Sequence, residues 1–266
     1  MDKNGGMKMK DIHIHLENGP YTQSWLMKFV EVAQSRGINE IWVLEHTHRF
    51  YEFNPMYQEM SEVSDKQATW LKTKNQIPLS SYINFIRAMR TRSFPVKIRF
   101  GLEVCFFPQH IDFIRQQLSA FKFDFVVGSV HSINNMAYDL KGISEDLLWN
   151  AYDPDWIYDQ YFATLKQLID SELFNGLAHP DTIKMFNHYP SYDCSNKWEE
   201  IADALLKASM YTENNVGAHY RYNHDDIGLS NQVFAIFEKK GVVLYPATDS
   251  HSPETVGIFL NELSKR

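Results

Sequence analysis

DIHIH, at Asp11–His15, alternates polar and apolar residues and therefore predicts a β-strand with both imidazoles on one face. Six similar short runs follow it along the chain, at Glu40–Leu44, Lys97–Val104, Phe125–Val130, Gly176–His179, Met210–Glu213 and Val242–Pro246. Stretches of helical period lie between them; the first contains Phe29 and Ala33 and is followed by Gly37, a typical residue at a helix C-terminus. Seven strands that alternate with helices indicate an α/β protein built as a barrel.

The length of the chain fits one domain, because 266 residues lie in the usual range of a single α/β barrel. No linker divides residues 1–266, so a single domain is expected. Residues 50–80 form the longest interval without a strand signal, and we interpret them as an inserted helical segment that covers the site like a lid. The polar residues 1–9 are expected to be partly disordered.

The composition argues against several classes of protein. The formal net charge is -7 and Lys and Arg do not cluster, so a nucleic-acid partner is not expected. No apolar run approaches the roughly 20 residues that span a bilayer, and the N-terminus lacks the apolar region of a secretory signal. A cytoplasmic protein without a membrane partner is therefore expected, and Cys105 and Cys194 form no disulfide framework. The 11 His residues are the unusual feature and need an explanation.

Imidazole and carboxylate side chains lie at the C-terminal ends of the predicted strands: His13, His15, Glu45, His46, Glu103, His131, His179, Asp249 and His251. In a barrel enzyme these strand ends form one face, so residues far apart in sequence converge there. His13 and His15 share one side of a strand and can reach one metal, as Asp249 and His251 can if their segment is extended. Imidazole and carboxylate donors without thiolate suit Zn²⁺, Mn²⁺ or Fe, so a polynuclear metal site is expected.

Six short motifs together resemble the PHP (polymerase and histidinol phosphatase) family. In chain order they are DIHIH at Asp11–His15, EH at Glu45–His46, GLEV at Gly101–Val104, GSVH at Gly128–His131, AHPD at Ala178–Asp181 and DSH at Asp249–His251. GLEV, GSVH and EH are similar to the histidinol-phosphate phosphatase branch. The resemblance implies a distorted (β/α)7, TIM-barrel-like fold that holds two to three divalent metal ions.

The resemblance also implies how the metal ligands are divided. One metal would be held by His13, His15, Glu103 and Asp249, a second by Glu103, His131 and His179, and a third by His46 and His251. Where several relatives place a further His, this chain has Tyr21, and Glu17 is the nearest alternative oxygen ligand. Glu213 and Asn215 keep the spacing of a Glu-x-Asn segment that relatives carry before the substrate loop.

The activity that the resemblance implies is hydrolysis of L-histidinol phosphate to L-histidinol and phosphate, in histidine biosynthesis, by attack of a metal-bridging hydroxide. The catalytic residues expected are Asp249, Glu103 and His251, and Asp249 could also take up the proton of the attacking water. Phosphate usually recruits Arg as a forked donor, and Arg49 and Arg221 are placed for this role. His48, His188 and His219 are candidates to protonate the leaving alkoxide or to contact a substrate imidazole, and a structural role is the alternative for each.

Two other functions fit the same residues. One is a PHP phosphoesterase of other specificity, acting on nucleotides or nucleic acid. The other is a non-catalytic metal-binding domain, which would bind metals and cleave no phosphate ester. The expected partner is a small phosphorylated substrate, and the sequence contains no signal for the oligomeric state.

Overall fold

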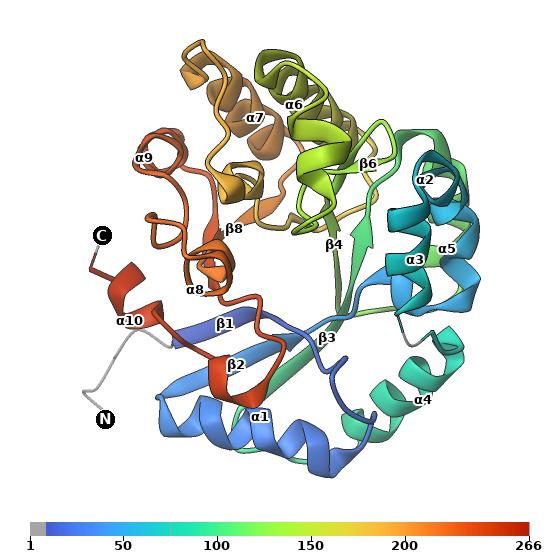
Figure 1. Cartoon of the computed structure of the whole chain (residues 1–266). Coiled ribbons are helices and arrows are strands. Elements are labelled where there is room, and N and C mark those ends of the chain that lie inside the picture. The colour runs from blue at the N-terminus through green and yellow to red at the C-terminus, as the bar shows by residue number, and fades with distance from the viewer. Residues whose placement is uncertain (1–8, 75, 266) are drawn as a thin grey trace.

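The computed structural model describes residues 9–74 and 76–265, and its centre is a sheet of seven parallel strands in the order β1-β2-β3-β4-β7-β8-β9 (Figure 1). The strands are β1 Met9–Ile14, β2 Ile38–Val43, β3 Lys97–Cys105, β4 Phe125–Ser129, β7 Gly176–Leu177, β8 Tyr211–Asn215 and β9 Leu244–Ala247. Each coincides with a strand predicted from the sequence. The disorder predicted for residues 1–9 falls on residues 1–8, which lie outside the described residues, and on Met9, which belongs to β1.

The first and last strands of the sheet meet at their C-terminal ends. There Ile14 forms an isolated parallel bridge with Ser250, and the His15 N–H donates to the Ser250 carbonyl at 2.7 Å. Asp11, which is buried, joins the same two strands because it accepts hydrogen bonds from the backbone N–H and the hydroxyl of Thr248 at 3.0 and 2.5 Å. The sheet therefore curls into a barrel whose seam is joined near the site, and the predicted distorted (β/α)7 barrel is confirmed.

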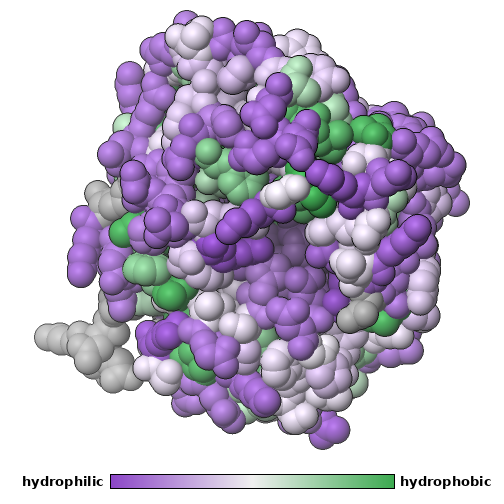
Figure 2. All heavy atoms as spheres, viewed as in Figure 1, coloured by the Kyte–Doolittle hydropathy of each residue, from purple (hydrophilic) through white to green (hydrophobic). Residues whose placement is uncertain are grey.

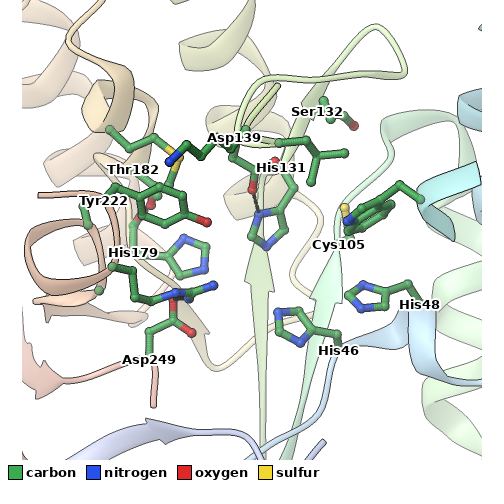
Figure 3. A pocket seen from close by; sticks show the side chains of 18 of the residues that line it. His46, His48, Cys105, His131, Ser132, Asp139, His179, Thr182, Tyr222 and Asp249 are labelled. Carbon is green, nitrogen blue, oxygen red and sulfur yellow. Dashed lines mark hydrogen bonds and ion pairs between the residues drawn. The ribbon is translucent and has the colours of Figure 1, made fainter. Parts of the chain in front are cut away.

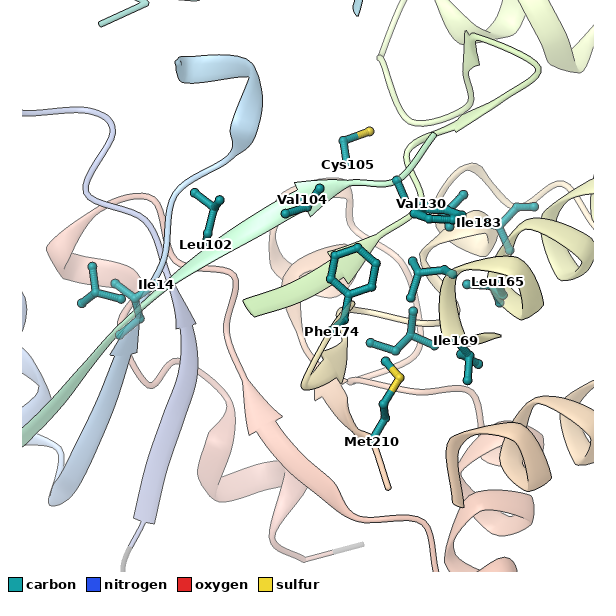
Figure 4. Packing of buried hydrophobic residues seen from close by; sticks show 14 of the residues in the cluster. Ile14, Leu102, Val104, Cys105, Val130, Leu165, Ile169, Phe174, Ile183 and Met210 are labelled. Carbon is teal, nitrogen blue, oxygen red and sulfur yellow. The ribbon is translucent and has the colours of Figure 1, made fainter. Parts of the chain in front are cut away.

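The helices lie outside the strands (Figure 1). The longer ones are α1 Gln23–Ser35, α4 Leu79–Arg90, α5 Ile111–Ser119, α6 Pro154–Asp170, α7 Ser195–Lys207 and α9 Asn231–Lys240. α1 begins after Thr22, whose side chain accepts the Trp25 N–H, and ends before Gly37, whose φ of 74° is the left-handed conformation that favours glycine there. Figure 4 shows Leu165 and Ile169 of α6 in the hydrophobic cluster beside β3 and β4.

The inserted segment is helical, as predicted. It comprises η2 Tyr51–Tyr57, α2 Gln58–Val63 and α3 Asp65–Lys72, and α4 already begins at Leu79. The other short elements are η1 Thr47–Arg49, η3 Pro108–His110, β5 Ser132–Ile133, β6 Met136–Ala137, η4 Glu145–Trp149, η5 Thr182–Phe186, α8 Gly217–Tyr222, η6 Pro253–Thr255 and α10 Leu260–Leu263. A helix long and apolar enough to cross a membrane does not occur in the part of the chain that the structure describes. Movement of the inserted segment as a lid stays a prediction.

Aromatic side chains fill the interior of the barrel below the site. The Trp42 ring of β2 lies 4.7 Å from the Phe125 ring of β4 and 5.8 Å from the Tyr245 ring of β9, between ring centroids. Because β2 and β9 are not neighbours in the sheet, these rings meet across the interior. Gly101 leaves room for them, since a Cβ at this position would lie 2.4 Å from the Phe125 ring. Glu103 lies two residues further along β3 and therefore faces the same interior, nearer the C-terminal ends of the strands than these aromatic rings.

Candidate metal centre

The predicted donors meet at the open end of the barrel. Figure 2 shows that this face is hollowed near its middle and that hydrophilic residues gather around the hollow. The cavity has a volume of about 300 Å³, and its lining includes Glu17, His46, His131, His179, Asp249 and His251. In Figure 3, His46, His131, His179 and Asp249 point toward one space from different strand ends. The structure thus brings together side chains that are far apart in sequence, such as Glu17 and His251, which are 234 residues apart.

Glu103 lies buried at the centre of this group. Three imidazoles face its Oε2 atom through Nε2: His13 at 3.2 Å, His15 at 3.4 Å and His46 at 3.2 Å. Two more face its Oε1 atom through Nε2: His131 at 2.9 Å and His179 at 3.1 Å. One carboxylate therefore links two groups of imidazoles, which is the arrangement that a carboxylate bridging two metal ions requires.

A further group of donors surrounds Glu17 near the mouth of the cavity. Glu17 Oε1 lies 2.7 Å from His251 Nδ1, and Glu17 Oε2 lies 3.5 Å from His46 Nδ1. Both of these imidazoles stack on the His15 ring, at centroid distances of 4.0 Å for His46 and 4.6 Å for His251. Tyr21 instead packs against aromatic residues of α4. Glu17, and not Tyr21, therefore lies beside His46 and His251.

Asp249 lies between the imidazoles and Arg221. Its Oδ1 atom is 3.4 Å from His15 Nε2 and 3.2 Å from His251 Nε2, and its Oδ2 atom accepts a hydrogen bond from Arg221 Nη1 at 2.7 Å. The φ of Asp249 is 54°, a left-handed conformation. Residues 249–251 therefore do not form the extended segment that would place Asp249 and His251 on one side. The left-handed conformation at Asp249 nevertheless brings these two side chains together.

Burial and neighbouring charges set the protonation of the donors. Burial lowers the pKa of His13, but the charges of Glu213 and Glu103 outweigh it and raise that pKa well above its usual value. Burial and the charge of His46 hold the pKa of His15 well below its usual value. Burial raises the pKa of Glu103, but the charges of His46 and His13 hold it well below the usual value. Glu103 is therefore ionised and His15 neutral, which are the forms that bind metal ions, whereas His13 is protonated and would release a proton on binding a metal ion.

The chemistry of the donor set fits divalent metal ions. His13 Nε2 and His15 Nε2 lie only 2.9 Å apart while both face Glu103 Oε2, so three possible ligand atoms crowd one place in a buried environment. Among the described residues, buried His15 Nδ1 and His179 Nδ1 have no hydrogen-bond partner. A cation held by several imidazoles and carboxylates relieves this crowding, and Zn²⁺, Mn²⁺ and Fe accept this mixture of nitrogen and oxygen ligands.

Two carboxylates outside the predicted ligand set orient the imidazoles. Glu213 Oε1 lies 2.8 Å from His13 Nδ1, and Glu213 Oε2 accepts the His179 N–H at 3.0 Å. Asp139 Oδ2 lies 2.6 Å from His131 Nδ1 (Figure 3). The contacts at His13 and His131 hold Nδ1 of each imidazole so that its Nε2 faces the central carboxylate, whereas the contact at His179 holds its backbone N–H. In the sequence, the Glu-x-Asn spacing indicated Glu213 as a residue shared with relatives. No sequence pattern indicated Asp139.

Two of the residues expected to contact substrate line the cavity, whereas Arg49, His188 and His219 do not. Arg221 lines it with a side chain that is 31% exposed. His48 also lines it, packed edge-on against Trp70 at a centroid distance of 5.4 Å. Arg49 lies outside this cavity, because its Nη1 donates to the backbone carbonyl of Glu17 at 2.9 Å. The expectation that Arg49 contacts the substrate is therefore not supported by its position.

His219 and His188 lie outside the lining of the cavity. His219 Nδ1 lies 2.6 Å from the His224 carbonyl, and the His219 ring packs edge-on against Phe259 at 4.8 Å. His188 stacks on Trp149 at a centroid distance of 4.6 Å. Neither position supports the predicted contact with substrate, and both imidazoles are engaged in contacts that hold the loops and helices around the site.

Comparison with known proteins decides the family. Residues 11–216 match the model of the PHP domain. The chain belongs to the PHP family. A curated PHP relative, named "Probable histidinol-phosphatase", comes from Deinococcus radiodurans and is 24% identical over 181 residues, which are 67% of this chain and 62% of the relative. This chain thus spans about 62% of the length of that relative.

Two solved structures share the PHP barrel. One, a candidate histidinol phosphatase from Listeria monocytogenes, has a TM-score of 0.73 and 18% identity, with 95% of this chain and 99% of that chain covered. The other is the histidinol phosphate phosphatase of Lactococcus lactis subsp. lactis in complex with zinc, L-histidinol and phosphate. It has a TM-score of 0.59 and 22% identity, with 92% of this chain and 87% of that chain covered. These likenesses confirm the fold, and the family predicted from the six motifs is confirmed as well.

Proposed function

We propose that the protein is a metal-dependent phosphomonoesterase that hydrolyses L-histidinol phosphate to L-histidinol and phosphate. The observation that carries this proposal is the arrangement around Glu103, where one carboxylate links two groups of imidazoles in a cavity of about 300 Å³. Such a cavity suits a small phosphate ester. The choice of ester rests on the relatives, because the Lactococcus lactis structure contains L-histidinol and phosphate.

In this proposal the cofactor is a set of two to three divalent metal ions, Zn, Mn or Fe. Their ligands are His13, His15, Glu17, His46, Glu103, His131, His179, Asp249 and His251. Support comes from the distances given above and from the zinc in the Lactococcus lactis structure. When bound, such ions supply an acidified water as the nucleophile and neutralise charge on the phosphate oxygens.

The residues of the chain then bind, orient and hold charge. Burial raises the pKa of Asp249, but the charge of Arg221 and hydrogen bonds from His15 and His251 hold that pKa well below its usual value. Asp249 is therefore an ionised ligand, and its low basicity makes it a weak proton acceptor. Arg221 presents a guanidinium at the cavity beside Asp249 and would bind the non-bridging phosphate oxygens.

The proposal is tested by metal analysis together with a panel of phosphate esters. The purified protein is loaded with Zn²⁺ or Mn²⁺, and phosphate release is measured from histidinol phosphate, nucleoside monophosphates and a nucleic-acid phosphodiester. We expect the highest kcat/KM for histidinol phosphate and loss of activity when a chelator removes the metal. Brisk turnover of other esters with little release from histidinol phosphate would reject the substrate. Bound metal without turnover of any ester would reject an enzymatic function.

Arg221→Ala is expected to raise the KM for the phosphate ester by about tenfold and to lower kcat by a smaller factor, because a charge-assisted hydrogen bond to the ground-state phosphate is lost. Steady-state kinetics of the metal-loaded variant check this expectation. Arg115→Ala is the matched control, since Arg115 is an exposed arginine of α5 that pairs with Asp112 far from the cavity lining. Kinetics equal to those of the control would show that Arg221 does not bind phosphate.

A further inference from the structure

Lys74 is a cation at the mouth of the metal centre. It follows α3 at the end of the inserted segment, and it lines the same cavity as His46 and Asp249. It also lines a second, more open hollow beside Glu17 and Arg49. Lys74 therefore lies where the cavity and this hollow adjoin.

Aromatic packing fixes the Lys74 side chain in this place. Trp70 precedes it by four residues, so the two side chains share one side of the helical turn. The Lys74 Nζ atom lies 4.3 Å from the centroid of the Trp70 ring, a cation–π contact. Trp70 in turn packs edge-on against His48, which lines the same cavity. The ammonium group is therefore held beside Trp70 in the lining of the cavity.

Among the described residues no carboxylate lies within ion-pair distance of the Lys74 ammonium, and the acidic groups that act on its pKa, Glu17 and Asp139, act from further away. Within residues 9–74 and 76–265, the lysine ion pairs are formed by Lys66, Lys97, Lys166, Lys184, Lys197 and Lys240. Arg221, the arginine of the cavity lining, is already paired with Asp249 at 2.7 Å, and the other lysine of the lining, Lys141, is exposed. Lys74 is half-buried, and burial lowers its pKa. A partly buried charge without an ion-pair partner is costly, and an anionic ligand in the cavity would supply that partner.

We propose that Lys74 binds the phosphate group of the substrate, together with Arg221. The two cations come from opposite parts of the structure, Lys74 from the inserted segment after α3 and Arg221 from α8 (Figure 1). The inference rests on the proposed function, because it takes a phosphate ester as the ligand. It gives the inserted segment a direct part in substrate binding, beyond covering the site.

Titration calorimetry of the zinc-loaded protein with inorganic phosphate tests this role without turnover. Lys74→Met keeps an aliphatic stem on Trp70 and removes the charge, and the Kd for phosphate is expected to rise by about tenfold or more. Lys74→Arg should restore most of the affinity. Lys72→Met is the matched control, because Lys72 is an exposed lysine at the end of α3, two residues before Lys74, and the Kd of this variant should equal that of the unmodified protein.

Three results would overturn the role of Lys74. They are a Kd of Lys74→Met close to that of the unmodified protein, an equal loss in Lys72→Met, or no phosphate binding by the unmodified protein. Zinc content and melting temperature are measured for each variant, and Lys74→Gln replaces Lys74→Met if the latter does not fold or load zinc. A protein that hydrolyses other phosphate esters but not histidinol phosphate would contradict the proposed substrate, while the phosphate titration would still decide on Lys74.

Discussion

Glu103→Gln is expected to lower kcat for phosphate ester hydrolysis by at least about a hundredfold and to reduce the number of metal ions bound per chain. Loss of a residue that merely orients a ligand already costs about 10–100-fold, and Glu103 faces five imidazoles through its two oxygens. An amide offers a single oxygen ligand, which binds metal ions more weakly than a carboxylate oxygen does. Its NH2 group cannot act as a metal ligand. Elemental analysis after dialysis, followed by steady-state kinetics, measures both effects.

Glu45→Gln is the matched control for this variant. Glu45 is a buried carboxyl at the end of β2, and its Oε1 accepts the Leu16 N–H at 2.8 Å. Burial raises the pKa of Glu45 to about 8, so the group is largely protonated at neutral pH and Gln reproduces its charge. Metal content and kcat of the control should stay near those of the unmodified protein. If Glu103→Gln kept its full metal content and most of its kcat, Glu103 would not be a bridging ligand.

Asp249→Asn should leave the fold intact and remove most of kcat, by about a hundredfold or more. The Asp249 carboxylate is ionised and faces His15 and His251, so the amide replaces a charged ligand with a neutral one. The substitution also removes the charge that holds the Arg221 guanidinium. Circular dichroism, metal analysis and kinetics of the purified variant separate an effect on folding from an effect on chemistry.

Asp225→Asn is suitable for comparison, because Asp225 is an exposed residue of the loop after α8 and does not line the cavity. Its kcat and metal content should be unchanged. A near-normal kcat for Asp249→Asn at full metal content would refute the assigned role. Loss of all metal from Asp249→Asn would instead place its main effect on metal affinity.

The strands could be predicted because buried parallel strands are short apolar runs, as at Phe125–Val130, where β4 spans Phe125–Ser129. α5 was not predicted, and within it only Ile114 is buried, which leaves little apolar period to detect. The β5–β6 hairpin was also missed, because its strands have two residues each. The sequence feature that could have indicated this hairpin is the pair Asn134-Asn135, because Asn favours the positive φ of a tight hairpin turn. The φ values of these two residues are 48° and 63°.

The metal donors could be predicted because the C-terminal ends of the parallel strands lie on one face of the barrel, whatever the conformation of the loops between them. Arg49 and His219 lie beyond these ends, in η1 and α8, where tertiary contacts set the direction of a side chain. Their partners, the Glu17 carbonyl and the Phe259 ring, are distant in sequence and could not be foreseen. Asp139 was missed for a related reason, since it reaches His131 from the loop that follows the hairpin.

The donors come from both the first and the last strand of the sheet. His13 and His15 lie in or next to β1, and Asp249 and His251 follow β9. A chain still emerging from the ribosome lacks Asp249 and His251 until the residues after β9 have been synthesised, so a metal site that uses these two ligands would be completed late in folding. A metal ion held there would then be a reversible cross-link that closes a loop of more than two hundred residues, and its binding free energy would add to the free energy of unfolding. When metal ions are scarce, the protein should therefore have a shorter lifetime in addition to losing its catalytic activity.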